Sequence, residues 1–591
     1  MIPGGKWREK ERMEPVKKLI ALFLCLCLMA GIVPVVAENT AVTHEITSAS
    51  YPLYVGTSNF GDVSLCFLDG ANDMPYIEAT EMHGVLASIM NSTTGNFNYT
   101  INTEGSVVTL TRNNLKTPGD VDDGAYAAFD FDKDTITFSD HDLFCWKENV
   151  TTVLDTTAIP TFNANGEPSI LQKIDKGNLD RYGDCLVVRC GDYGIDLILQ
   201  DGKYLVPLQT MVDFILAPAR GQNLFFNGQI LYLAQTISLG DEQYYAAPTG
   251  ERSAALAEYG YKELCMMLDY FYGLKDAHKI ESFDKLFHSV TFDRMLMDTD
   301  AKIADLAINY LINDYLDDSH STWRAPSYLS GSVDFGIPRG ASSSNIFAEM
   351  DRYKEAREKY YPDGVPGYEE FGNTAYITFD SFEIPNVNDT EGYYLVEDVN
   401  TLADTDVIGL IMKAHAQITR ENSPIENVVL DLSCNGGGMN DVAAYVLGWL
   451  LGEVSLSVEN PMTGAMSTAA YRADVNRDRK FDEKDTVADK RIFCLTSPCS
   501  FSNANMVACM LKDTHRVTMM GRTSAGGSCE VQNASSAWGS SFTISSPKRS
   551  SFLKNGSFYD IDRGADPDYQ ISTPEKYYDR KTLTDYINSL Y

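Results

Sequence analysis

Two serines, a histidine and a run of glycines, far apart in the sequence, could together perform acyl transfer. Ser319 and His320 come just after a predicted helix, and Ser502 comes just before another. Between them, Gly436 and Gly437 follow a run of apolar residues typical of a buried strand. A serine hydroxyl is a weak nucleophile unless a neighbouring base takes its proton, and the oxyanion that forms needs hydrogen-bond donors. The residue types therefore predict Ser502 as nucleophile, His320 as base and the N–H groups of the glycines as oxyanion donors.

Each of these residues also has a simpler interpretation. Ser502 could be a plain N-cap, because serine is a preferred residue at that position. The glycine run could be a tight turn, and as a phosphate loop it lacks the lysine of a P-loop and the spacing of a dinucleotide fingerprint. A lone histidine such as His320 is usually structural, although Asp317, Asp318 and Ser319 lie beside it and could hold one tautomer. The catalytic interpretation depends on the three segments occurring together.

Alternating strand and helix patterns in the C-terminal part of the chain would position these residues. Runs typical of buried strands alternate with helical runs, and this alternation predicts an α/β domain. The expected strands are residues 374–379, 428–432, 492–496 and 516–520, and the expected helices are residues 407–418, 441–451 and 504–511. Two of the strand ends would then lead into the glycine run and into the segment before Ser502.

Five short motifs occur in order along this part of the chain. They are residues 317–321, 428–438, 500–505, 521–527 and 564–568. In type and order they resemble the motifs of the serine peptidases of the tail-specific (C-terminal-processing) and tricorn type. The resemblance implies an α/β catalytic domain of crotonase-like (αββ spiral) type, preceded by a small helical subdomain.

The family has two catalytic versions, and the resemblance implies the one that uses serine and histidine. In the other version a lysine in the glycine-rich segment after the strand activates the serine, but here residues 523–528 contain no lysine. The implied mechanism has Ser502 attack the peptide carbonyl and His320 transfer the proton, with Ser319 orienting His320.

The resemblance also implies the remaining site residues. The N–H group of Asn503 would join one from the glycine run in the oxyanion hole. The family's glutamate would fall near Ile561, which cannot ionise, so Asp560 or Asp562 would replace it as the charge partner of the base. The reaction implied in this way needs no cofactor.

The first 37 residues predict a secretory signal. Lysines and arginines precede an apolar run that begins at Leu19, and small residues lead up to Ala37, as in the basic, apolar and cleavage regions of such a signal. An uncleaved signal that anchors the protein in the membrane is the alternative. We expect a secreted or cell-surface protein, with no stable membrane partner after cleavage, because no later run is long and apolar enough to span a bilayer.

The segment after the signal predicts a separate α+β region. Within residues 45–250, the stretches 74–110 and 205–233 both follow a turn and both run strand, helix, strand. They resemble copper amine oxidase N-terminal-like modules, which need bind no copper, and no His/Cys cluster with metal spacing occurs here. Residues 251–329 then predict the helical subdomain, and residues 330–591 predict the peptidase core.

Charge and cysteine content narrow the classes of function. The formal net charge is −34, which argues against nucleic acid as a partner because phosphates would be repelled. With 44% hydrophobic residues the chain is of globular composition. Its 12 cysteines, two of them in the signal, are too sparse for a disulfide scaffold. Export would allow Cys185 and Cys190 to pair across a hairpin, and buried free thiols are the alternative.

Residues 474–485 have the oxygen spacing of a calcium loop. Positions 1, 3, 5, 9 and 12 are Asp474, Asn476, Asp478, Asp482 and Asp485, and the carbonyl of Lys480 stands at position 7. Arg479 replaces the usual glycine at position 6, and an aspartate replaces the usual glutamate at position 12, so we expect a weak site. A calcium ion here would brace the catalytic core without touching substrate, and a solvated acidic turn is the alternative.

The sequence thus favours a secreted serine endopeptidase that cleaves protein or peptide substrates. A catalytically inactive peptide- or cell-wall-binding module on the same fold and an esterase are the alternatives. A serine-directed fluorophosphonate probe distinguishes the inactive module, because only an activated serine reacts with it, and casein and ester substrates distinguish the esterase. Neither the cleavage preference nor the oligomeric state follows from the sequence.

Overall fold

The computed structural model describes residues 43–86, 98–113, 125–145, 154, 157–174, 181–386 and 389–591. The predicted signal at residues 1–37 lies outside these residues. The chain divides into two compact units, Met1–His44 and Glu45–Tyr591, and the second unit carries every candidate site residue. Within the described part, none of the helices combines the length and the apolar character that crossing a bilayer requires.

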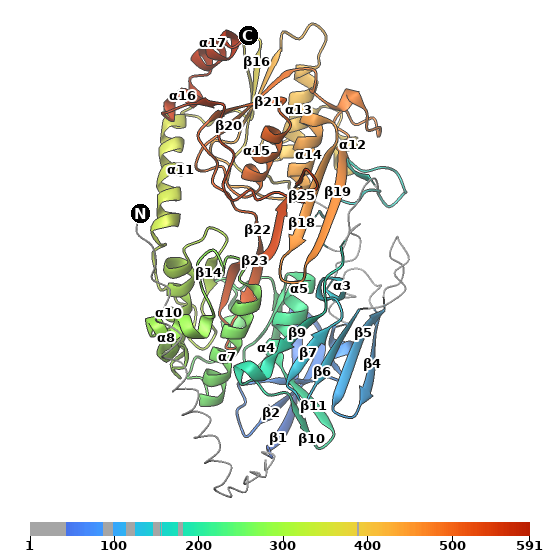
Figure 1. Ribbon diagram of the computed structural model, residues 1–591, viewed down its shortest axis with the longest axis vertical. Helices are drawn as coiled ribbons and strands as arrows, with labels where there is room; N and C mark the ends of the chain where they lie inside the picture. Colours follow the sequence, from blue (N-terminus) through green and yellow to red (C-terminus); the bar gives the residue numbers. More distant parts are fainter. Residues whose placement is uncertain are drawn as a thin grey trace, which may run out of the picture. The chain divides into compact units, whose positions relative to one another are not determined.

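Two sheets make up much of the N-terminal region (Figure 1). One has seven strands in the order β10-β11-β3-β2-β1-β13-β12, and the other is an antiparallel sheet in the order β4-β5-β6-β7-β9. The strands of the first are β1 (Ile46–Val55), β2 (Ser58–Leu68), β3 (Tyr76–Glu78), β10 (Ile198–Gln200), β11 (Lys203–Pro207), β12 (Asn223–Phe226) and β13 (Leu231–Ala234). Those of the second are β4 (Asn98–Glu104), β5 (Val107–Asn113), β6 (Tyr126–Asp130), β7 (Thr135–Phe138) and β9 (Leu186–Arg189).

The two stretches predicted as repeated modules do not form two copies of one unit. Strand β3 of the first stretch pairs with β11 of the second in the seven-stranded sheet, whereas β5 of the first stretch lies in the other sheet. The local signals were correct, because both turns are present and β11 leads into a helical segment of α4 (Leu208–Met211), η2 (Val212–Leu216) and α5 (Ala217–Arg220). The pairing partners, however, come from distant parts of the chain.

Cys185 and Cys190 are free thiols, as are the other cysteines among the described residues. They flank the four-residue strand β9 and so stand at opposite ends of one strand, with Cys185 exposed and Cys190 buried. The bridge that export would allow is therefore absent, and of the two thiols only Cys190 fits the alternative of a buried free thiol.

A group of helices leads to Ser319 and His320. These helices are α7 (Ala254–Phe271), α8 (Phe283–Val290), α9 (Phe292–Leu296) and α10 (Ala301–Tyr310), and α10 continues into the π-helical segment η3 (Leu311–Leu316). The segment ends at Asp317, whose backbone is left-handed with φ 46°. Strand β14 (Thr322–Ala325) follows at once, so Ser319 and His320 lie in a short turn between helix and strand.

A six-stranded sheet in the C-terminal part carries the glycine turn and the segment before Ser502. Its order is β15-β16-β17-β20-β21-β26, with only β15 antiparallel to its neighbour. The strands are β15 (Tyr368–Phe371), β16 (Thr374–Thr378), β17 (Asn427–Asp431), β20 (Arg491–Thr496), β21 (Val517–Gly521) and β26 (Tyr569–Gln570), and the helices α13 (Val407–Ile418), α14 (Asn440–Leu451) and α15 (Asn503–Asp513) lie between them in the sequence. The four predicted strands and three predicted helices are confirmed. The strands were recognisable because parallel strands, buried on both faces, are nearly continuous apolar runs.

Parallel strands place their carboxyl ends at one edge of the sheet. Strand β17 ends at Asp431, before the glycine turn, and β20 ends at Thr496, before the segment that leads to Ser502. Gly438 forms an isolated parallel bridge with Phe382, just beyond β16. Three strand ends therefore meet around the glycine turn.

A second six-stranded sheet brings the turn with His320 to the same place. Its order is β14-β23-β18-β19-β8, and β22 also pairs with β23. The strands not yet given are β8 (Leu171–Ile174), β18 (Val454–Asn460), β19 (Ala465–Ala473), β22 (Cys529–Ser535) and β23 (Ser541–Ser551). Because β8 precedes residue 250 and pairs with β19, the N-terminal region and the core share this sheet.

Shorter elements and helices complete the unit from Glu45 onward, which is mixed α/β with several sheets. They are α3 (His141–Phe144), η1 (Cys190–Tyr193), α6 (Glu242–Tyr245), α11 (Ala341–Tyr360), α12 (Gly392–Leu395), η4 (Val399–Thr401), η5 (Glu483–Asp485), β24 (Leu553–Lys554), β25 (Ser557–Phe558), α16 (Glu575–Tyr578) and α17 (Arg580–Ser589). The crotonase-like type of the core stays a prediction.

Candidate active site

Ser502 occupies a strained turn between β20 and α15. Its backbone has φ 55° and ψ −123°, a region that non-glycine residues rarely adopt. Its N–H donates to the carbonyl of Gly526 at 2.9 Å, and its own carbonyl accepts from the N–H of Met506 at 2.9 Å. Its side chain makes no capping hydrogen bond, so the interpretation as a plain N-cap is wrong. Among the described residues the hydroxyl has no hydrogen-bond partner, so it is available for other chemistry.

Close backbone packing around Ser502 explains the glycines on either side of it. Gly437 has φ 107°, and a Cβ there would lie 2.7 Å from Cβ of Ser502. A Cβ on Gly527 would lie 2.6 Å from the ring of Phe501 and 2.9 Å from the nitrogen of Ser502. A Cβ on Gly438 would lie 2.4 Å from the carbonyl oxygen of Phe382. Only glycine allows these backbones to approach so closely.

The N–H groups near Ser502 differ in whether they have partners. The N–H of Gly436 donates to the carbonyl of Asp380 at 3.2 Å, and that of Gly437 donates to Oδ1 of Asn435 at 2.8 Å. Among the described residues, by contrast, the N–H groups of Gly438 and Asn503 have no hydrogen-bond partner. Both of these residues line the same cavity as Ser502, and so their N–H groups can serve an incoming oxygen atom.

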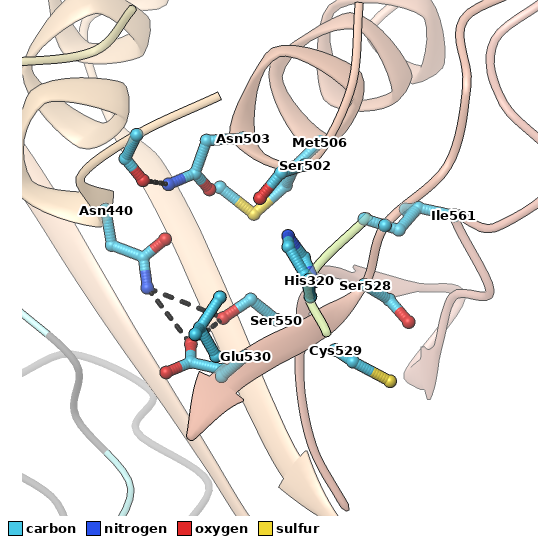
Figure 2. Close-up of a pocket in the computed structure, with 13 residues that line it drawn as sticks. His320, Asn440, Ser502, Asn503, Met506, Ser528, Cys529, Glu530, Ser550 and Ile561 are labelled. Atoms are coloured by element: carbon cyan, nitrogen blue, oxygen red, sulfur yellow. Dashed lines mark hydrogen bonds between the residues drawn. The ribbon is translucent and has the colours of Figure 1, made fainter. Parts of the chain in front are cut away.

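His320 lies in that cavity with its imidazole directed toward Ser502 (Figure 2). Its ring packs against that of Phe501 with centroids 4.8 Å apart. Burial lowers the pKa of His320 below its ordinary value of 6.5, while the charges of Asp318 and Asp562 and a hydrogen bond with the backbone of Cys529 act in the opposite direction. The neutral imidazole, which can act as a base, is therefore the main form at neutral pH.

Asp318 rather than Ser319 fixes the turn that carries His320. Oδ1 of Asp318 accepts from the N–H groups of His320 at 3.1 Å and Ser321 at 2.9 Å, and from the hydroxyl of Ser545 at 2.7 Å. Within the described part of the chain, the hydroxyl of Ser319 makes no hydrogen bond to His320. The aspartate two residues before the histidine is a turn signal of the Asx type, and it pointed to this role.

Asp560 and Asp562 lie beside the site, but neither bonds to His320. The carboxylate of Asp562 accepts from the N–H groups of Gly527 at 3.1 Å and Ser528 at 2.8 Å and from the hydroxyl of Ser528 at 2.9 Å. Asp560 is exposed and accepts from the N–H of Asp562 at 3.0 Å. Asp562 thus acts on His320 through its charge and by holding the loop that follows Gly526.

The cavity has a volume of about 220 Å³ and is lined from six separate parts of the chain. The lining residues are His320, Gly438, Asn440, Ser502, Asn503, Met506, Gly527, Ser528, Cys529, Glu530, Val531, Ser550 and Ile561. No lysine is among these described lining residues. Sequence reasoning missed Asn440, Glu530 and Ser550, because no local pattern marks them, and it did not choose Gly438 from within the glycine run.

The predicted calcium loop is closed by its own backbone. Asp485 accepts from the N–H groups of Val475 and Asn476, at 2.8 and 3.1 Å, and forms a capping box with Asp482. Three other side chains of the loop accept hydrogen bonds from its backbone. Asn476 accepts from the N–H of Asp478, Asp478 from that of Lys480, and Asp474 from that of Arg479. Across the described residues, no three His, Cys, Asp or Glu side chains form a group that could hold a metal ion.

Residues 373–571 match the model described as Peptidase family S41. This segment contains the glycine turn, Ser502, the loop at Gly527 and Asp562, and only the turn with His320 lies outside it. The segment is thus a serine-type peptidase domain of family S41, with the mixed α/β fold of that family. No curated protein matches the chain.

Several solved structures are similar to parts of the chain. The photosystem II D1 C-terminal processing protease is 19% identical, with a TM-score of 0.25 over 34% of this chain and 43% of that one. A lipoprotein from Streptococcus agalactiae is 14% identical, with a TM-score of 0.34 over 57% of this chain and 97% of that one. The tricorn protease is 11% identical, with a TM-score of 0.28 over 84% of this chain and 46% of that one. This chain thus spans less than half of the D1 processing protease.

Proposed function

We propose that the protein is an exported serine endopeptidase that hydrolyses protein or peptide substrates through an acyl-enzyme on Ser502. The backbone of Ser502, at φ 55° and ψ −123° before a helix, carries the proposal. Such strain persists only where the surrounding structure enforces it, and a sharp strand-to-helix turn of this kind exposes the nucleophile of many hydrolases. The free hydroxyl and the two unpaired N–H groups beside it support the same conclusion.

The geometry supports each step of acyl transfer. His320 accepts the hydroxyl proton as Oγ of Ser502 attacks the carbonyl carbon, and it returns that proton to the leaving amine. Water then hydrolyses the ester, with His320 again acting as base. No hydrogen bond joins Ser502 and His320 among the described residues, and such contacts commonly tighten only when substrate binds.

The oxyanion hole in this proposal consists of the N–H groups of Asn503 and Gly438. Asn503 is the residue predicted from the sequence, and its N–H lies at the start of α15, where the helix dipole favours negative charge. Gly438 replaces Gly436 and Gly437 as the second donor, because the N–H groups of those two glycines already have partners. The hydrogen bond of His320 with the backbone of Cys529 would fix the ring, in the role that the sequence suggested for Ser319.

Digestion of two substrate types tests the proposal against its alternatives. The purified protein is expected to cleave unfolded casein, and Ser502 is expected to be needed for it. Hydrolysis of small esters without any cleavage of casein would favour the esterase. If neither substrate is cleaved while the protein is folded, the inactive binding module is favoured instead.

The pH dependence of cleavage tests whether Asp562 is the charge partner of His320. Because burial lowers the pKa of His320, kcat/KM is expected to hold as pH falls to 6.5 and to decline only below it. Asp562 favours the imidazolium, so D562N should lower the pKa of His320 further and move this acid limb to lower pH. An asparagine can still accept from the N–H groups of Gly527 and Ser528. D560N is the control, and an acid limb that D562N leaves in place would remove Asp562 from this role.

A structural calcium ion in the loop of residues 474–485 is a separate proposal. One buried atom supports it: Oδ1 of Asp474 lies in a side chain that is 0% exposed, and it has no hydrogen-bond partner. To bind the same ion, the carboxylate of Asp485 would have to turn away from the N–H groups of Val475 and Asn476. The loss of these hydrogen bonds would make the calcium site weak. We expect a chelator at fixed ionic strength to lower Tm by about 1–3 °C, and D474N to abolish the difference. An unchanged Tm of the wild-type protein would remove calcium from the account.

A further inference from the structure

On the basis of the proposed peptidase activity, we propose that Glu530 selects a cationic side chain, of lysine or arginine, next to the scissile bond. Glu530 lies on β22 directly after Cys529, which lines the same cavity as His320. Its side chain lines the cavity together with Ser502 (Figure 2). The carboxylate is therefore within the space that a substrate residue beside the cleaved bond must enter.

The carboxylate of Glu530 is held on one side and free on the other. Oε1 accepts from the hydroxyl of Ser550 at 2.5 Å and from Nδ2 of Asn440 at 3.2 Å. Among the described residues, Oε2 has neither a hydrogen-bond partner nor an ion-pair partner. Two neutral donors thus fix the orientation of the side chain without neutralising its charge, and such preorganisation lowers the cost of binding a cation.

Nothing in the cavity supplies the missing positive charge. The described lining residues include no lysine or arginine, and the negative charges of Asp318 and Asp562 act on the His320 side. A substrate cation would supply the positive charge that these lining residues lack. An acidic substrate side chain would be repelled in the same place.

The rest of the cavity suits a long aliphatic stem that ends in a charge. Met506 and Ile561, each 1% exposed, contribute apolar walls. Val531, which is 52% exposed, borders the cavity next to Glu530. Lysine and arginine bury their methylene groups along such surfaces while the charged end reaches a polar group.

A peptide library cleaved by the folded full-length protein, with the cut sites read by mass spectrometry, tests the inference. We expect lysine and arginine to be enriched at one of the two positions that flank the cut. E530Q keeps acceptors for Ser550 and Asn440 but loses the charge. It is expected to lower kcat/KM for lysine and arginine peptides by about 10- to 100-fold, with the values for alanine and leucine peptides unchanged. E453Q, on the surface, is the matched control and should keep the preference.

The possible outcomes separate this inference from the proposed function. Cleavage by the wild-type protein without lysine or arginine enrichment would overturn the role of Glu530 and leave the peptidase proposal intact. Enrichment that E530Q preserves would also overturn it. If the folded wild-type protein cleaves no peptide at all, the proposed function falls, and this inference falls with it. The wild-type library needs no variant, so a folding defect in E530Q would not prevent the test.

Discussion

The variant S502A is expected to lose about 10⁴- to 10⁶-fold in kcat/KM for peptide substrates. Alanine removes the hydroxyl of Ser502, which lies in the same cavity as Gly438, Asn503 and His320. It keeps the strained backbone, so Tm should stay close to that of the wild-type protein. Initial rates with a fluorogenic peptide, together with a thermal unfolding curve for each protein, provide the measurement.

The matched control for S502A is a second nucleophile in the same loop. Cys499 is 0% exposed and is not one of the residues that line the cavity, and burial raises the pKa of its thiol. C499A is therefore expected to keep the wild-type rate. Wild-type activity in S502A, with the rate lost in C499A, would move the nucleophile to the cysteine and contradict the account.

The variant H320Q is expected to lose about 10³- to 10⁶-fold in kcat/KM. Glutamine retains the approximate size of the side chain but cannot take the proton of Ser502. The loss should appear in kcat rather than KM, because His320 acts on the reacting atoms and not on the binding of the peptide chain. Single-turnover kinetics at saturating substrate measures the chemical step alone and so separates an effect on kcat from an effect on KM.

His288 offers the control for the second prediction. It is exposed on α8 and interacts with Asp284, with no lining role in the cavity. H288Q should therefore have wild-type kinetics. If H320Q retained activity with the pH profile of the wild-type protein, another group would have to be the base.

The strands and helices of the core could be predicted because each is marked locally. Residues 428–431 of the apolar run are buried on both faces in β17, and Gly437 and Gly438 after it are required by close backbone contacts with Ser502 and Phe382. Ser502 and His320 were identified because Ser502 directly precedes a helix and His320 lies in the turn just after one. Residue types at element ends are visible in a sequence, and their convergence follows from parallel strands that end at one edge.

Other features could not be predicted, because they depend on contacts between distant residues. The free N–H of Gly438 was missed because the choice among three glycines depends on Asp380 and Asn435 as acceptors. The role of Glu530 depends on Asn440 and Ser550, which come from a helix and a neighbouring strand. The strained backbone of Ser502 has no sequence pattern of its own.

The N-terminal region shows the limits of local patterns most clearly. The turns at Gly70 and Gly202 were correctly identified, yet the strands that follow them pair with each other rather than within two modules. Likewise, a spacing of five residues suggested that Cys185 and Cys190 pair, but a single strand separates them. Sequence spacing gives the length of an element but not the partner against which it lies.

Covalent labelling tests most directly whether one hydroxyl has been made reactive by an imidazole from a distant turn. The folded protein is treated with a fluorophosphonate, digested, and mapped by mass spectrometry, with H320Q in parallel. We predict a single adduct on Ser502 in the wild-type protein and almost none in H320Q. An unlabelled wild-type protein that is fully folded, or an adduct on any other residue, would contradict the account.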